Sequence, residues 1–150
     1  MVLLVPFDGS DLSKAALKRA TEFADYREED ITALSVIPDD AEYARERGWL
    51  DADEAFDVAA IADRMREQAE TIAPRASFRY EVPEDVSSIA STTTDITRTI
   101  REVAHEEGAS IVFIGSENAG RVSTPVCSVG SPVSNDPHYD VHIVRHPKAT

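Results

Sequence analysis

Three glycines and a serine in the last third of the chain offer the clearest chemistry in this sequence. Gly115 directly follows a short apolar run, Gly120 comes soon after it, and Gly130 is followed by Ser131. Because glycine has no Cβ, backbone N–H groups at such positions can approach an anion closely. At a helix start, where backbone dipoles add about half a positive charge, Gly130 and Ser131 would present N–H groups and a hydroxyl to a phosphate. The pattern therefore predicts a loop that cradles polyphosphate.

The apolar run before this loop, residues 111–114, is typical of a strand buried on both faces of a parallel sheet. In open α/β sheets, ligands bind just beyond the carboxyl ends of the strands. The loop therefore follows its strand at the place where this architecture binds its ligands.

Strand and helix signals alternate along the chain. Apolar or alternating runs predict strands over residues 1–7, 30–37, 77–82, 111–114 and 140–145. Apolar spacings of three and four predict helices over residues 11–25, 53–73 and 95–107, with shorter helices before Gly48 and near Pro132. The alternation predicts an α/β fold in one domain over residues 1–150, with a parallel sheet, helices on both faces and right-handed crossovers.

The glycine loop resembles the G-x2-G-x9-G-[ST] motif of nucleotide-binding members of the universal stress protein family. Gly120, nine intervening residues, Gly130 and Ser131 match its second half. Four residues instead of two separate Gly115 from Gly120, and Asn118 stands where the second glycine would fall. The resemblance covers essentially the whole chain. It implies a doubly wound, flavodoxin-like or Rossmann-like sheet of five parallel strands in the order 3-2-1-4-5.

The resemblance also implies where ATP would lie. It places Pro6, Asp8 and Val36 near the adenosine, and the glycines along the phosphates. Two of the candidates have alternative roles: Asp8 could contact ribose or Mg²⁺ or form an Asx turn, and Arg121 could pair with a phosphate or be a solvated loop arginine. The complete set of candidate cofactor-binding residues is Pro6, Phe7, Asp8, Val36, Gly115, Asn118, Gly120, Arg121, Gly130, Ser131 and Val133.

This family resemblance implies a stress-response regulatory protein that binds ATP or a related adenine nucleotide. It also implies a homodimer paired through the fifth strand, residues 140–145, with any Mg²⁺ reaching the site through the phosphates. The sequence contains no recognisable nucleophile–base arrangement and no metal-ligand motif, so we expect no enzyme activity, and slow ATP hydrolysis is not predicted. The alternative is a dimeric interaction module that binds no nucleotide. The altered glycine spacing and Pro132, which lacks an N–H, favour that alternative.

Cysteine content and hydropathy predict a cytoplasmic protein. Cys127 is the single cysteine, so no internal disulfide can form, which indicates a reducing compartment. No apolar run approaches the ~20 residues of a membrane span, and we expect neither a signal peptide nor a membrane partner.

The charge of the chain is strongly acidic. Twenty-eight acidic residues face fifteen basic ones, for a formal net charge of −13. Only Lys14, Lys18 and Lys148 are lysines, and this composition resembles the acidic, lysine-poor surfaces of proteins from salt-loving archaea. The charge also argues against a nucleic-acid partner, which requires a basic patch. We therefore expect a salt-rich cytoplasm, with an ordinary acidic protein as the alternative.

We predict that the midpoint of thermal unfolding is higher in molar KCl than in dilute buffer. At ~1 M salt the Debye length falls to about 3 Å, so repulsion among the surface carboxylates nearly vanishes. Thermal melts across a KCl series measure the effect, and equal midpoints in dilute and molar KCl would contradict the halophilic interpretation.

Overall fold

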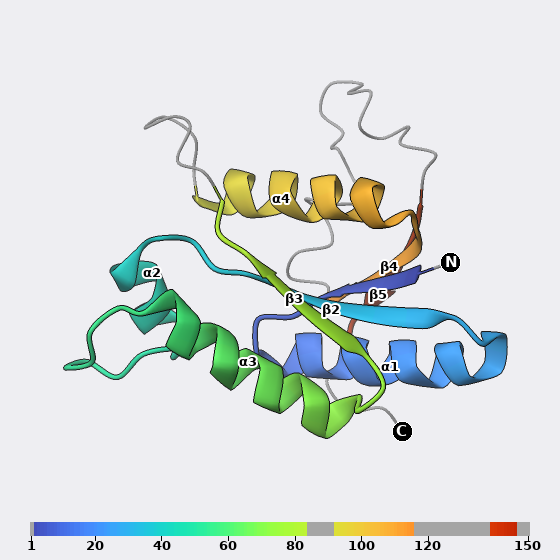
Figure 1. Cartoon of the computed structure of the whole chain (residues 1–150), viewed down its shortest axis with the longest axis horizontal. Coiled ribbons are helices and arrows are strands. Elements are labelled where there is room, and N and C mark those ends of the chain that lie inside the picture. Colours follow the sequence, from blue (N-terminus) through green and yellow to red (C-terminus); the bar gives the residue numbers. More distant parts are fainter. Residues whose placement is uncertain (1, 84–91, 116–138, 147–150) are drawn as a thin grey trace.

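Five parallel strands form one sheet in the order β3-β2-β1-β4-β5 (Figure 1). The computed structural model describes residues 2–83, 92–115 and 139–146. Its elements are β1 (Val2–Pro6), α1 (Asp11–Arg27), β2 (Asp30–Val36), α2 (Ala41–Glu46), α3 (Val58–Ile72), β3 (Ser77–Glu81), α4 (Thr92–Glu107), β4 (Ala109–Gly115) and β5 (Asp140–Val144). The predicted fold class and strand order are confirmed.

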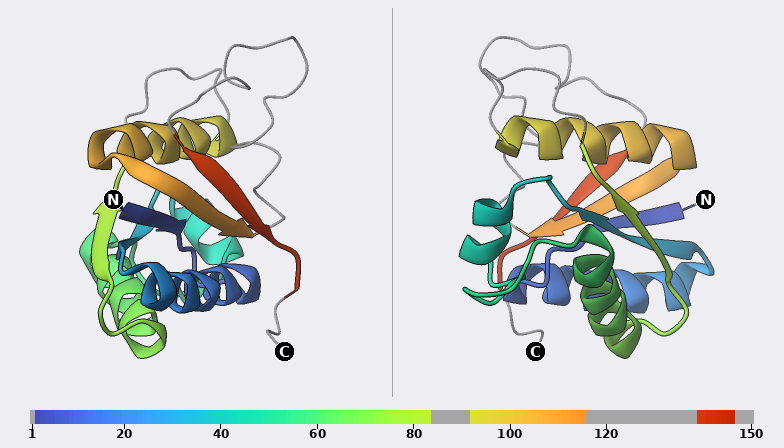
Figure 2. Two further views of the ribbon diagram at one scale, coloured as in Figure 1. Left: turned by 90° about the vertical axis from the view of Figure 1, so that its right-hand side faces the viewer. Right: turned by 60° about the vertical axis from the view of Figure 1, so that its left-hand side comes forward.

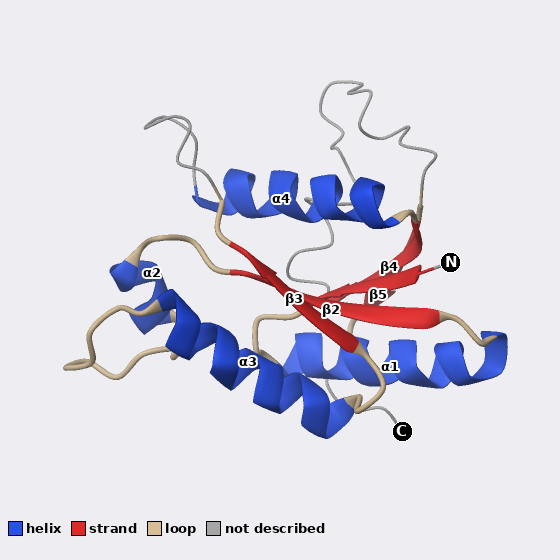
Figure 3. Ribbon diagram, in the orientation of Figure 1, coloured by secondary structure: helices blue, strands red, loops and turns tan. Residues whose placement is uncertain are grey.

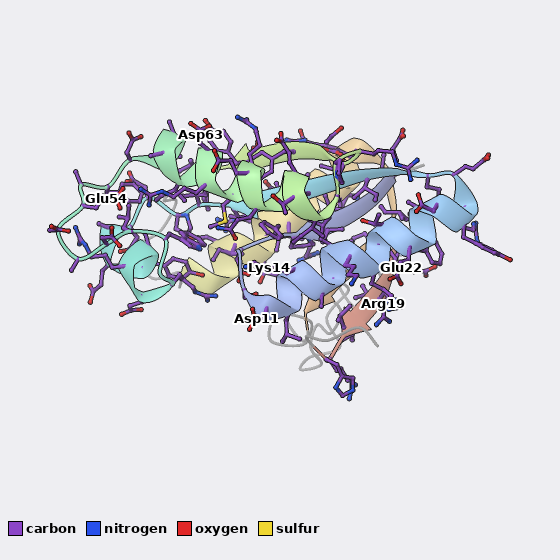
Figure 4. The ribbon with its side chains drawn as sticks, turned by 90° about the horizontal axis from the view of Figure 1, so that it is seen from below. Asp11, Lys14, Arg19, Glu22, Glu54 and Asp63 are labelled. Atoms are coloured by element: carbon purple, nitrogen blue, oxygen red, sulfur yellow. The ribbon has the colours of Figure 1, made fainter. Side chains whose placement is uncertain are left out.

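Helices cover both faces of this sheet. Helix α4 packs on one face, and α1 and α3 pack on the other (Figures 1 and 3). Side chains alternate along each strand, so Leu3 and Phe113 join the core under α1 and α3, whereas Leu4 and Val112 join the core under α4. The outer surfaces of the helices carry charged side chains, such as Glu22 on α1 and Asp63 on α3 (Figure 4).

The carboxyl ends of β1, β2 and β4 lie at the same edge of the sheet, because all strands run in parallel. Helix α1 begins at this edge, and α2 lies beside it, at the left of Figure 1 and toward the front in the right-hand view of Figure 2. This edge is where the sequence places its candidate ligand site.

Two helix starts differ from the prediction. Helix α3 begins at Val58, not at Asp53, because the Asp57 side chain accepts hydrogen bonds from the N–H groups of Ala59 and Ala60. The residues before Asp57 form a turn in which the Asp51 N–H donates to Glu54 Oε1 at 3.1 Å. Helix α4 begins at Thr92, three residues before the predicted start at Asp95.

Other predicted boundaries agree closely with the structure. Ser10 is the N-cap of α1, and its side chain accepts from the Ser13 N–H. Gly108 follows α4 with a φ of +65°, a left-handed conformation that glycine adopts at little cost. The short helix predicted near Pro132 lies outside the described residues. Among the residues that the structure describes, no helix is long and apolar enough to cross a membrane.

Candidate functional site

The turn between β1 and α1 is built around Asp8. The Ser10 N–H donates to Asp8 Oδ1 at 2.9 Å, which closes an Asx turn. Gly9, between them, has a φ of +81°, a conformation that side-chain-bearing residues rarely adopt. The Asp8 N–H points at Ser13 Oγ, 3.4 Å away. Asp8 therefore forms the Asx turn that was one of its two predicted roles. The turn uses only Oδ1, so the other carboxylate oxygen, Oδ2, can make a separate contact.

Two residues that follow α2 contact the carbonyl oxygen and the second carboxylate oxygen of Asp8. The Trp49 Nε1–H donates to the Asp8 carbonyl oxygen at 2.9 Å, and Arg47 Nη1 lies 3.3 Å from Asp8 Oδ2. Trp49 is 6% exposed and packs edge-to-face on Tyr43, with ring centroids 5.7 Å apart. Neither contact with Asp8 could be foreseen from the sequence.

Helix α3 contacts the segment after α2 through Arg64. Arg64 Nη1 donates to the Trp49 carbonyl oxygen at 2.6 Å, and Arg64 also forms an ion pair with Glu54. Glu54 lies in the loop before α3 (Figure 4). The hydrogen bond from Arg64, followed by one from the Asp51 backbone, lowers the pKa of the Glu54 carboxyl. Because both side chains of this pair are partly exposed to solvent, the ion pair adds little to stability, and its main effect is to orient Arg64 toward the Trp49 carbonyl.

The candidates Phe7 and Val36 are core residues on opposite faces of the sheet. Phe7 is buried under α1 and α3, and Val36 is buried under α4. The Phe7 N–H donates to the Leu34 carbonyl, and Ser35 Oγ donates to the Phe7 carbonyl, both at 2.7 Å. These bonds fix the backbone where β1 and β2 end. A ligand at this edge would therefore meet the backbone of Phe7 and Val36 more than their side chains.

Gly115 lies against the first turn of α1. A Cβ added at Gly115 would come within 2.8 Å of Leu12 Cβ, closer than real Cβ atoms approach one another. Glycine is therefore required here for packing alone, whether or not a phosphate lies nearby. The same packing brings the end of β4, where the glycine loop starts, beside the N-terminus of α1.

We predict that Gly115→Ala lowers the free energy of unfolding by about 1–3 kcal/mol, the usual cost of overpacking. Urea denaturation followed by circular dichroism measures it. A double-mutant cycle with Leu12→Gly isolates the contact, because removing the Leu12 Cβ should reduce the cost of Gly115→Ala. Additive costs in the cycle would contradict the packing explanation.

The structure therefore brings together part of the predicted site. Pro6, Phe7, Asp8, Val36 and Gly115 lie at the carboxyl ends of β1, β2 and β4. The remaining candidates lie outside the described residues, and their role stays a prediction; they are Asn118, Gly120, Arg121, Gly130, Ser131 and Val133. Within the described residues, no group of three or more His, Cys, Asp or Glu side chains is arranged to hold a metal ion.

Sequence reasoning missed Arg47 as a residue of this edge. Arg47 and Asp8 are 39 positions apart, and no periodicity or motif links them. The sequence signals near Arg47 were Gly48, which ends a predicted short helix, and the apolar pair Trp49 and Leu50, and none of them points to Asp8.

Comparisons with known proteins agree with this architecture. The profile of the universal stress protein family matches residues 1–145. A universal stress protein solved in complex with cAMP is 22% identical, with 99% of this chain and 98% of that chain covered and a TM-score of 0.54. UspA from Lactobacillus plantarum is 22% identical, with 97% of each chain covered and a TM-score of 0.52. A universal stress protein from Archaeoglobus fulgidus is 17% identical, with 97% and 93% covered and a TM-score of 0.55.

No curated protein matches the sequence. The solved structures are too distant in sequence to show more than a shared fold. The family profile, in contrast, spans nearly the whole chain. This chain belongs to the universal stress protein family.

Proposed function

We propose that this protein binds an adenine nucleotide, with ATP as the expected ligand, at the carboxyl ends of β1 and β4. The observation that carries the proposal is the close approach of Gly115 to the start of α1, next to the Asp8 turn. The first residue of the glycine loop thus lies beside a helix N-terminus, where the helix dipole would stabilise a phosphate. The cAMP complex of a similar universal stress protein supports an adenine ligand.

The nucleotide would act as a regulatory ligand in a stress response. Among the described residues we identify binding groups but no nucleophile with a positioned base, and we propose no catalytic role. Any Mg²⁺ would be held through the phosphates. We further propose that the protein works in the cytoplasm, where ATP is abundant.

The proposed homodimer uses β5, an edge strand of the sheet. Among the described strands, β5 pairs with β4 alone, and its Ile143 is 37% exposed. An edge strand with free backbone groups can pair with a second copy of itself. Size-exclusion chromatography with light scattering tests this proposal: a mass of about twice 16.4 kDa supports the dimer, and a mass near 16.4 kDa refutes it.

Calorimetry tests whether the protein binds a nucleotide. ATP, ADP, AMP, cAMP and GTP are titrated separately into the protein in molar KCl with Mg²⁺. We expect saturable binding of adenine nucleotides, with one site per chain and weaker or no binding of GTP. No heat and no thermal shift at millimolar ATP would refute nucleotide binding.

The second candidate function is a dimeric interaction module without nucleotide. One observation favours it: both carboxylate oxygens of Asp8 already have partners, Ser10 and Arg47, as expected for a purely structural aspartate. A stable dimer that shows no response to any of the five nucleotides would support this alternative.

A further inference from the structure

Arg47 is the cation that faces the candidate site from α2. Its Nη1 lies 3.3 Å from Asp8 Oδ2, and the side chains of Arg47 and Asp8 are 36% and 21% exposed. Its guanidinium donates to Asp8 Oδ2 through Nη1, and the same planar fork carries further N–H groups that could bind a ligand. The pair is thus open to solvent at the edge where the strands end.

Tyr43 holds Arg47 in place through both its backbone and its ring. Arg47 is the C-cap residue of α2, and its N–H donates to the Tyr43 carbonyl oxygen at 3.1 Å. Its Cζ also lies over the Tyr43 ring, 4.8 Å from the centroid. Tyr43 packs in turn on Trp49, which donates to the Asp8 backbone. A guanidinium held on such a platform loses less side-chain entropy when it binds a ligand than a free surface arginine does.

Electrostatics indicates what kind of ligand would use this cation. A carboxylate at the mouth of the site repels phosphate, and the whole chain has a formal charge of −13. Arg47 neutralises Asp8 in the free protein. When a phosphate approaches, the planar fork can exchange its single contact with the Asp8 carboxylate for a bidentate contact with two phosphate oxygens, a geometry that the fork matches well.

We infer that Arg47 is the phosphate-recognition residue of this site: it screens Asp8 in the free protein and contacts a phosphate of the bound adenine nucleotide. This inference rests on the proposed function and extends it. It states that Arg47, at the end of α2, is the residue that distinguishes phosphorylated nucleotides from nucleosides. The adenosine part of the ligand does not depend on Arg47, whereas the phosphate part does.

The test is calorimetry of ATP and adenosine with the wild type, Arg47→Gln, Arg47→Lys and Arg45→Gln, all in one buffer of fixed KCl and Mg²⁺ concentration. Arg47→Gln should weaken ATP binding about tenfold, the effect of losing a hydrogen bond to a charged group at a partly exposed site, and should change adenosine binding less than about threefold. Arg47→Lys should fall between the wild type and Arg47→Gln for ATP, because it keeps the charge and loses the fork.

Arg45→Gln is the matched control. It removes the same charge two residues earlier, in the last turn of α2, but Arg45 donates to the Glu54 carbonyl oxygen at 3.3 Å and not to Asp8. Its ATP affinity should stay within about threefold of wild type, and circular dichroism with a thermal melt confirms that each variant folds.

Four results would overturn the assignment. If Arg45→Gln and Arg47→Gln lost equal ATP affinity, the cause would be the overall charge and not a contact of Arg47 with phosphate. If Arg47→Gln lost equal affinity for ATP and for adenosine, Arg47 would support the structure of the site and would not recognise phosphate. If the ATP affinity of Arg47→Gln equalled that of the wild type, Arg47 would not contact the ligand, and the proposed function would still stand. A wild type that binds neither ligand would instead refute the proposed function, and this assignment with it.

Discussion

Trp49→Ala is expected to lower the free energy of unfolding by about 3–5 kcal/mol, the usual cost of truncating a buried tryptophan. Trp49 is 6% exposed and fills the space among α2, α3 and the β1–α1 turn. The truncation also removes the hydrogen bond to the Asp8 carbonyl and the edge-to-face contact with Tyr43. Urea denaturation followed by circular dichroism gives the free energy, because the variant lacks the single tryptophan that fluorescence would report.

Two further variants separate the causes of this loss. Trp49→Phe keeps an aromatic ring but removes the N–H donor, so it should cost about 1–3 kcal/mol through the unsatisfied Asp8 carbonyl. Tyr26→Ala truncates an aromatic residue that is 88% exposed, and it should change stability by less than about 0.5 kcal/mol. A Trp49→Ala cost as small as that of Tyr26→Ala would show that the segment after α2 does not hold the Asp8 turn in place.

Gly130→Val should abolish or strongly weaken ATP binding, by at least about tenfold, while the protein stays folded. The motif places Gly130 at the far end of the phosphates, where a branched side chain would prevent the close approach of backbone N–H groups to an anion. Calorimetry with ATP measures the loss, and a thermal melt shows that the fold is kept.

Ala52→Val is a suitable control for this variant, because Ala52 is exposed in the turn between α2 and α3 and lies outside the proposed site. Its ATP affinity should equal that of the wild type. If Gly130→Val bound ATP as well as Ala52→Val does, the glycine motif would not be part of the nucleotide site.

Most helices and strands could be predicted because each has a characteristic local pattern of apolar and polar residues. The predicted strand over residues 111–114 and the predicted helix over residues 11–25 agree with β4 and α1 to within two residues at each end. The start of α3 was wrong because Asp53 and Asp57 are both good capping residues, and only the hydrogen bonds of Asp57 to Ala59 and Ala60 decide between them. The strand order came from the family resemblance, since no periodicity records which strands are neighbours.

The site was less predictable because its parts meet through tertiary contacts. Asp8 could be read from the turn that it forms, but its ion pair with Arg47 joins two segments whose separation depends on the packing of Trp49. Gly115 was predicted as a phosphate residue, and its contact with Leu12 gives it a packing role that sequence spacing cannot reveal. Such contacts depend on the assembled fold, which a linear motif does not describe.

The most direct test of the central claim is amide hydrogen exchange, measured by mass spectrometry on the wild type with and without saturating Mg²⁺–ATP in molar KCl. Bound nucleotide should slow exchange in peptides that cover residues 6–13 and 115–134, because the amides of the β1–α1 turn and the glycine loop would lie at the ligand. Peptides from the opposite, amino-terminal edge of the sheet, such as residues 27–30 and 73–77, should exchange as before. Unchanged exchange at residues 6–13 and 115–134 under saturating ATP, or protection confined to another part of the chain, would contradict a nucleotide site at the carboxyl ends of β1 and β4.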